Sequence, residues 1–285
     1  MEFDSNWCRH CGADKALTKE HIPPRATGND GVGTLYREVQ GVLKAFEQFS
    51  DGHAVPTLCG PCNNGASDRG LPQAYAKWQE DVIYQLRQVA AAYSAKTGKT
   101  PNDLWSHETA PGVPFILPLV HGQGTSITLQ PGRVARQILG MILAIQMDKF
   151  LLTEYPQLKE AYEPKGPSDI GPMTLHVALA NLGMNYLTSG GGKATVNLHT
   201  GSVSGLQGFW MLSCPPFLMA LTEGDEAPIS GTRIDHWFKY PAKGSPATEQ
   251  FSKSERRVSY PIANRKKDLL VAKMYQDQAL MPTSS

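Results

Sequence analysis

The spacing of apolar residues predicts two long amphipathic helices in the middle of the chain. Within residues 72–98, apolar side chains recur every three or four positions, which is the period of one helical face. Residues 132–152 show the same spacing. Pro72 suits the first turn of the first helix and Gly98 suits its C-terminal cap. We expect the apolar stripe of this helix to pack in the core; it consists of Tyr75, Trp78, Val82, Leu86, Val89 and Tyr93.

Beyond Gly171 the pattern changes to short apolar runs separated by glycine and proline clusters. Such runs predict the strands of an antiparallel sheet. The segment SGGGK joins two of them and lacks the spacing of a phosphate-binding loop, so we interpret it as a hairpin turn. One further short strand is expected inside the loop region 109–126. The four sheet strands are expected within residues 173–182, 193–200, 207–214 and 217–224.

Composition changes this picture little. The chain has 285 residues, 41% hydrophobic and 19% charged, and this length fits one large domain or two modest ones. We expect a division near residue 70, with a small zinc module at 1–70 and a helical plus antiparallel β domain at 71–285.

Charge gives weak guidance on partners, because the formal net charge is only +1. A nucleic-acid surface would therefore have to be a local basic patch. The best candidate is the basic segment 253–273, expected to be helix-like, with a solvated surface helix as the equal alternative. Arg133 and Arg136 begin the second long helix. They could bind phosphate, but a solvated helix face is the favoured interpretation.

The first residues, MEFDSNW, lack the apolar stretch of a secretory signal, and the longest apolar run, ILGMILAI, is too short to span a bilayer. These features predict a cytoplasmic protein with no membrane contact. Disulfides are disfavoured in that compartment, so paired cysteines there indicate metal binding.

Four cysteines, Cys8, Cys11, Cys59 and Cys62, form two CxxC pairs. The short spacing lets both thiolates of a pair reach one ion, and two pairs complete the tetrahedron of a closed zinc site. Because protein ligands occupy all four coordination positions, we expect this zinc ion to be structural and not catalytic. The alternative is two unrelated thiol pairs, one of them redox-active. The fifth cysteine, Cys214, lies in an apolar run and is expected in the core.

The first CxxC pair, the segment EHIPP at 20–24 and the segment LCGPCNN at 58–64 together resemble the HNH endonucleases, specifically a zinc-stapled branch with a Glu-His first motif. The resemblance covers roughly residues 6–70 and implies a ββα-metal finger. The predicted fold class is therefore α+β: an N-terminal ββα-metal HNH module with a four-cysteine zinc site, followed by helices and an antiparallel sheet.

By this resemblance, His21 matches the general base that deprotonates the water attacking the scissile phosphate. Glu20 matches the acidic ligand of one catalytic divalent ion, Mg²⁺ or Mn²⁺, and Asn63 matches its distal ligand. Asn64 is an equally placed alternative to Asn63. Such ions prefer oxygen ligands, and a neutral imidazole can accept a proton at cellular pH. Side chains alternate along a strand, so Glu20 and His21 are expected on opposite faces unless a twist or bulge redirects one.

The chain departs from the family at the middle motif position, where an asparagine is often found and this sequence has Ala54. Two replacements could orient His21: the neighbouring His53, through a one-residue shift, or a backbone carbonyl. His10, inside the first CxxC pair, is expected to face solvent or contact phosphate.

The leading interpretation is a metal-dependent HNH endonuclease, a hydrolase acting on DNA phosphodiester bonds in a defence or mobile-element setting. The alternative is a non-catalytic zinc-stapled module that binds nucleic acid or a protein partner. EHIPP favours the enzyme, because a binding module has no need of a base beside a carboxylate. The missing middle asparagine and the near-neutral charge favour the alternative. The sequence leaves the oligomeric state open, including a homo-oligomer.

Overall fold

The computed structural model describes residues 6–39, 42–98, 114–118, 129–146, 149–163, 166–179, 186–187, 191–196, 203–214, 216–225, 231–242 and 257–261. Small strands and two helices make up the first part of the chain: β1 (Leu17–His21), the 3-10 helix η1 (Arg25–Thr27), β2 (Gly33–Val39), β3 (Val42–Phe49), β4 (Ala54–Cys59), α1 (Gly60–Asp68) and α2 (Leu71–Thr97). The later elements are β5 (Pro114–Pro118), α4 (Pro131–Ala144), α5 (Phe150–Glu154), α6 (Gln157–Tyr162), β6 (Met173–Leu179), β7 (Tyr186–Leu187), β8 (Gly191–Val196), β9 (Val203–Cys214), β10 (Phe217–Glu223), β11 (Thr232–Arg233), the 3-10 helix η2 (Asp235–Lys239) and β12 (Arg257–Pro261).

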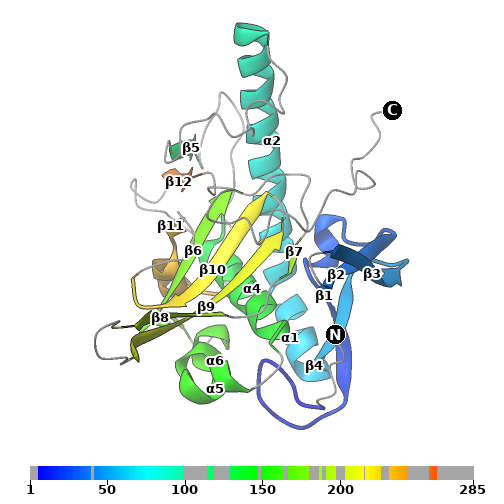
Figure 1. The fold of residues 1–285 in the computed structure, drawn as a ribbon, viewed down its shortest axis with the longest axis vertical. Coiled ribbons are helices and arrows are strands. Elements are labelled where there is room, and N and C mark those ends of the chain that lie inside the picture. The colour runs from blue at the N-terminus through cyan, green and yellow to red at the C-terminus, as the bar shows by residue number, and fades with distance from the viewer. Residues whose placement is uncertain are drawn as a thin grey trace.

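Strands β1 and β4 form a two-stranded antiparallel sheet, and α1 follows β4 directly. Their register runs from Leu17 opposite Cys59 to His21 opposite Ala54. The chain between them forms a separate antiparallel ribbon, β2–β3, which lies to the side of the molecule in Figure 1. The pairing of β1 with β4 therefore brings the two CxxC pairs to the same end of one small sheet.

The second half of the chain contains a six-stranded sheet, which confirms the predicted antiparallel arrangement. Its order is β11-β6-β10-β9-β7, with β8 also paired to β9. In β10, Phe217, Met219 and Leu221 join the main core, while Leu218 and Ala220 join a smaller cluster. Neighbouring side chains point to opposite faces of a strand, so both faces of β10 are covered and its sequence is a continuous apolar run.

The first predicted long helix is confirmed as α2, and its apolar stripe begins in the core. Tyr75 and Trp78 are fully buried, and the Trp78 ring stacks on Phe217 with the centroids 3.7 Å apart and the planes 7° from parallel. This contact joins α2 to the large sheet, which lies in front of α2 and α4 in Figure 1. The side chains of Leu86, Val89 and Tyr93 lie outside the described part of the chain.

The second predicted helix, 132–152, is divided in the structure. Helix α4 ends at Ala144 and α5 begins at Phe150. Gln146 explains the end of α4: its side-chain amide donates to the carbonyl of Ile142 at 2.7 Å, the acceptor that its own backbone N–H would take in a continued helix. The backbone N–H of Gln146 instead donates to Leu143.

One hydrophobic cluster contains side chains from both sides of residue 70. Ile22, Val55 and Ala66 belong to the same buried cluster as Trp78 and Ile138. The small sheet and α1 therefore pack on the helices that support the large sheet. The division of the chain at residue 70 stays a prediction.

The interpretation of Arg136 as a solvated or phosphate-binding residue is wrong, because its side chain is fully buried. Burial lowers its pKa to about 10, so it stays charged at neutral pH. The guanidinium donates to four carbonyls and one hydroxyl, which belong to Gly132, Tyr240, Gly166, Phe238 and Ser168. Through these hydrogen bonds Arg136 holds residues 166–168 and 238–240 against α4.

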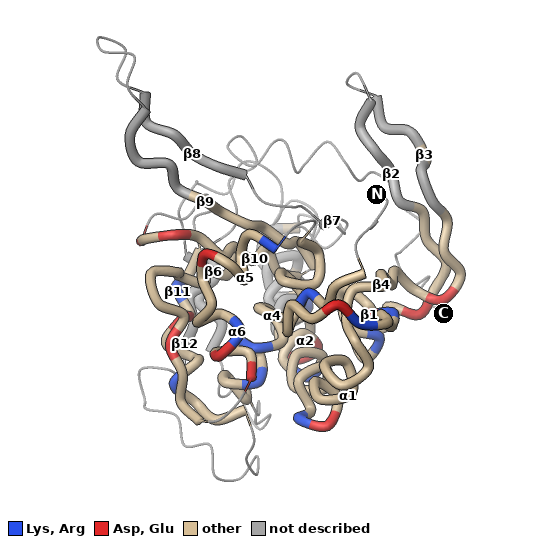
Figure 2. The backbone as a smooth tube through the Cα atoms, turned by 90° about the horizontal axis from the view of Figure 1, so that it is seen from below, with Lys and Arg blue, Asp and Glu red and all other residues tan. Residues whose placement is uncertain are grey.

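Three further predictions concern the loop region 109–126, the basic segment 253–273 and the segment SGGGK. The strand expected within 109–126 is confirmed as β5, which pairs with β12. Because β12 lies inside the basic segment 253–273, the helix-like expectation is wrong for residues 257–261. The rest of that segment lies outside the described residues, as do the first two residues of SGGGK. The last three residues of SGGGK belong to β8 and pair with β9, so the interpretation as a hairpin turn is wrong for them. Figure 2 shows basic and acidic residues interspersed along the described backbone.

Among the described helices, none combines the length and the apolar composition needed to cross a membrane.

Substitution of Arg136 should test its fastening role. Arg136→Met keeps an apolar stem but removes every hydrogen bond that the guanidinium donates, so we expect the free energy of unfolding to fall by about 3 kcal/mol or more. Urea denaturation followed by circular dichroism measures this loss. Arg87→Met, at an exposed position of α2, is the matched control and should change stability little. Equal losses in the two variants would contradict the role.

Candidate metal centre and the residues beside it

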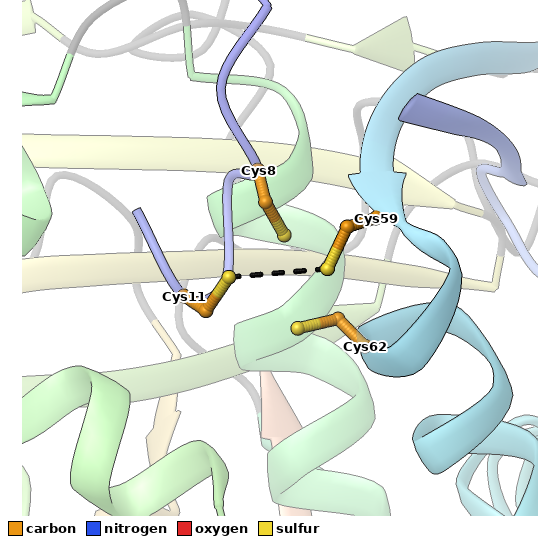
Figure 3. Close-up of side chains that lie close together, drawn as sticks. All are labelled: Cys8, Cys11, Cys59 and Cys62. Atoms are coloured by element: carbon orange, nitrogen blue, oxygen red, sulfur yellow. Dashed lines mark hydrogen bonds between the residues drawn. The ribbon is translucent and has the colours of Figure 1, made fainter. Parts of the chain in front are cut away.

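The four cysteines of the two CxxC pairs lie together, and they can hold a metal ion such as zinc. Cys8 and Cys11 belong to the turn before β1, Cys59 ends β4 and Cys62 lies in the first turn of α1 (Figure 3). Their sulfur atoms all lie within 4.8 Å of one another, and the Sγ atoms of Cys11 and Cys59 are 3.9 Å apart. A tetrahedral zinc ion with bonds of about 2.3 Å spaces its sulfurs about 3.8 Å apart. Cys214 lies away from this cluster, buried in the main core as predicted.

Local backbone geometry makes the first pair converge. The N–H of Gly12 donates to the carbonyl of Cys8 at 2.8 Å, and the N–H of Cys8 donates to Ala13 at 2.9 Å. Gly12 has a φ of +75°, a conformation that glycine adopts without steric cost. The tight turn places Cys8 and Cys11 on one side of the loop.

The protonation of the sulfurs is consistent with a metal centre. The pKa of Cys8 is lowered to about 3, mainly because the Cys62 thiol donates a hydrogen bond to its thiolate. The same hydrogen bond raises the pKa of Cys62, and burial raises that of Cys11. A thiolate is the form that binds metal, and a bound cation would favour this form at all four positions.

The first CxxC pair is anchored in the core by its two middle residues, which corrects the expectation for His10. His10 is 3% exposed, and its Nε2 donates to the carbonyl of Gly140 in α4 at 3.0 Å. Burial lowers its pKa to about 4, and its ring packs on Tyr162 with the centroids 4.0 Å apart. A side chain at position 140 would meet both rings, so only glycine allows this approach. His10 therefore does not face solvent.

Arg9 makes the second anchor and is 1% exposed. Its Nε donates to the carbonyl of Gln146 at 3.0 Å, and its guanidinium lies over the Trp7 ring, 4.3 Å from the centroid. The two adjacent polar side chains between Cys8 and Cys11 thus bind one carbonyl inside α4 and one just beyond its C-terminal end. This anchoring was not predicted, because CRHC carries no signal of burial.

Glu20, the predicted acidic ligand, lies on β1 with its side chain partly buried. Burial raises its pKa to about 7. Within the described part of the chain, its carboxylate takes part in no hydrogen bond or ion pair. A buried carboxylate without a partner is unfavourable, since losing hydration destabilises its charged form.

His21, the predicted base, is oriented by a backbone carbonyl. Its Nε2 lies 3.0 Å from the carbonyl oxygen of Asp51. A carbonyl can only accept a hydrogen bond, so this contact assigns the proton to Nε2 and leaves Nδ1 with a free lone pair. His53, the other candidate for this role, instead donates from its own Nδ1 to the carbonyl of Ile22 at 3.2 Å. Ala54 lies opposite His21 in the β1–β4 register.

Asn63, the predicted distal ligand, lies in the first turn of α1 and reaches back to β1. Its Nδ2 donates to Thr18 Oγ1 at 3.0 Å and to the carbonyl of Lys19 at 3.1 Å. These acceptors place the amide nitrogen against β1, where Lys19 directly precedes Glu20. The amide oxygen Oδ1 therefore points away from these two acceptors. Asn64 is exposed and makes no comparable contact among the described residues.

No model of a known protein family, no curated protein and no solved structure matches this chain.

Sequence reasoning missed the residues that support the candidate site rather than those that form it. Asp51 and Asn29, which hold the loop beside His21, belong to no recognisable motif. Their only sequence signal is a typical loop composition of Asn, Asp and Gly before and after the ribbon.

The four-thiolate centre leads to a prediction about metal content. Purified protein should contain one zinc ion per chain by elemental analysis, and Cys59→Ser should lose it. A structural zinc ion contributes several kcal/mol to folding, so we expect Tm to fall by about 10 °C or more in this variant. Cys214→Ala is the control and should keep the zinc. Full zinc content in Cys59→Ser would contradict a four-cysteine site.

Proposed function

We propose that the N-terminal region is the catalytic centre of a metal-dependent HNH-type endonuclease that hydrolyses DNA phosphodiester bonds. The observation that carries the proposal is the hydrogen bond from His21 Nε2 to the Asp51 carbonyl. It leaves Nδ1 as the basic nitrogen of a ring whose tautomer is set by the fold. A base with one defined free nitrogen is what general base catalysis requires.

The neighbouring oxygens support the proposal. The Glu20 carboxylate is partly buried without a partner in the described chain, and Asn63 is held beside the same strand by its amide nitrogen. A carboxylate and an amide oxygen form a donor set that suits Mg²⁺ or Mn²⁺. These two residues would hold the ion. When bound, the ion would neutralise phosphate charge and stabilise the leaving oxygen.

In the proposed reaction, His21 Nδ1 accepts a proton from a water molecule as the water oxygen attacks phosphorus. The new phosphorus–oxygen bond forms as the bond to the leaving oxygen breaks. Asp51 keeps the resulting imidazolium in place through its carbonyl, because both ring nitrogens then carry protons and Nε2 still donates. The zinc centre would take no part in this step, since cysteine occupies each of its positions.

The same geometry supports a scaffold role for zinc. The four cysteines join the turn before β1 to the junction of β4 and α1. Glu20 and His21 lie on β1, while Asn63 directly follows Cys62. Zinc at this junction would therefore hold the proposed base and the proposed ion ligands in one arrangement.

Removal of the proposed base is the direct test. His21→Ala should lower the cleavage rate of plasmid DNA by about 10²-fold or more, because general base catalysis contributes about 10²–10⁴-fold. Gel assays with Mg²⁺, with Mn²⁺ and without either ion measure this rate. His236→Ala, on η2, is the control and should cleave like the wild type.

Two results would count against the proposal. Equal inactivity of wild type and His21→Ala across metals and salts, with zinc and fold intact, would favour a non-catalytic binding module. Cleavage of RNA but not of DNA would contradict DNA as the substrate and would leave the proposed phosphodiesterase activity in place.

A further inference from the structure

The carbonyl that orients His21 belongs to a turn outside both strands of the small sheet. After β1 the chain passes through η1 and the β2–β3 ribbon, and it returns to β4 through residues 50–53. Asp51 lies in this returning turn. The position of its carbonyl, and with it the tautomer of His21, depends on what fixes residues 50–53.

The side chain of Asn29 fixes this turn by joining the outgoing and returning chain. Its Nδ2 donates to the carbonyl of Pro23 at 2.6 Å and to the carbonyl of His53 at 3.0 Å. Its Oδ1 accepts the backbone N–H of His53 at 2.8 Å. These partners use both amide hydrogens and the oxygen, and they leave no ambiguity about which atom is nitrogen.

A second contact holds the turn against the same segment, residues 29–31. Gly52 is buried with a φ of +75°, and its N–H donates to the carbonyl of Gly31 at 2.9 Å. A Cβ at position 52 would meet the backbone carbonyl of Asn29. Backbone contacts at Gly52 and His53 therefore hold the turn against residues 29–31.

The ion pair of Asp51 is a weaker support. Arg25 donates to the Asp51 carboxylate at 2.7 Å, but the two side chains are 58% and 64% exposed. Exposed ion pairs contribute little, because water and salt screen them. The hydrogen bonds of Asn29 are shielded better and act on the backbone itself.

We infer that Asn29 is a positioning residue for His21: its amide holds the 50–53 turn so that the Asp51 carbonyl accepts the Nε2 proton and Nδ1 stays free. This inference deepens the proposed function and rests on it. Among the described residues, the hydrogen bonds of Asn29 go to Pro23 and His53 and that of His21 goes to Asp51, so Asn29 acts through the turn. Ala54, at the middle motif position, has no polar side-chain group that could hold the turn. The hydrogen bonds of Asn29 hold it instead.

The isosteric variant Asn29→Asp tests this role directly. A carboxylate has no N–H to donate, and it would face the carbonyl oxygens of Pro23 and His53. Nitrogen-15 NMR of the histidine rings reports which ring nitrogen carries the proton, with His21→Ala identifying the signal. We expect the wild type to carry it on Nε2, and Asn29→Asp to show a mixture of both tautomers. Asn6→Asp, the same change at an exposed residue, should resemble the wild type.

Cleavage kinetics give the second readout. A misplaced base typically costs about 10²-fold in rate, so kcat of Asn29→Asp should fall by about that factor, with KM for DNA unchanged. A purely structural role would lower stability but leave the tautomer and kcat of the folded protein as they are. An unchanged tautomer, or an unchanged kcat in an active enzyme, would overturn the inference.

These readouts separate the two proposals. If the wild type is inactive on every substrate, the proposed function fails, and the NMR comparison still decides whether Asn29 sets the ring. Circular dichroism and zinc content show whether Asn29→Asp is folded. If it is not, Asn29→Ala removes the hydrogen bonds without adding charge, and the same tautomer shift is expected from it.

Discussion

The structure depends on the convergence of four sulfur atoms from two places in the chain that are nearly fifty residues apart. The turn carrying Cys8 and Cys11 meets the junction of β4 and α1, which carries Cys59 and Cys62. The β1–β4 pair alone is a two-stranded sheet of five or six residues per strand, and such sheets are marginal in water. A metal ion bound at the sulfurs would hold the two strands together at one end of the sheet and supply the missing free energy.

The convergence also links the small sheet to the rest of the protein. Arg9 and His10 lie between the first two cysteines and donate to backbone carbonyls at Gln146 and Gly140. The metal centre and helix α4 therefore share a contact through a single turn. Helix α4 in turn holds η2 through Arg136. A chain of buried polar contacts thus runs from the sulfurs to the C-terminal part of the described structure, beside the apolar core.

Much of this arrangement follows from local patterns in the sequence. The helix at α2, the strands of the large sheet and the cysteine cluster were predicted because periodicity and CxxC spacing are local signals. His10 and Arg136 were misjudged because the burial of a polar residue depends on acceptors far away in sequence. Gly140 and Tyr240 provide those acceptors, and nothing near His10 or Arg136 indicates them. The end of α4 was missed for a related reason. The apolar periodicity continues past Gln146, but the Gln146 side chain donates to the carbonyl of Ile142 in place of its own backbone N–H.

For His21 too, the sequence indicated the residue but not the group that orients it. The residue itself was predicted from EHIPP, but the acceptor that orients it is a main-chain atom, which no motif can encode. A backbone carbonyl has an advantage over a side chain here: it can only accept, so it specifies one tautomer and cannot rotate to offer a donor. Its disadvantage is that the turn carrying it must be held by other residues. Asn29 and Gly52, which lie before and after the β2–β3 ribbon, meet that need, so orientation of the ring depends on residues 29–31 and 51–53 instead of one motif position.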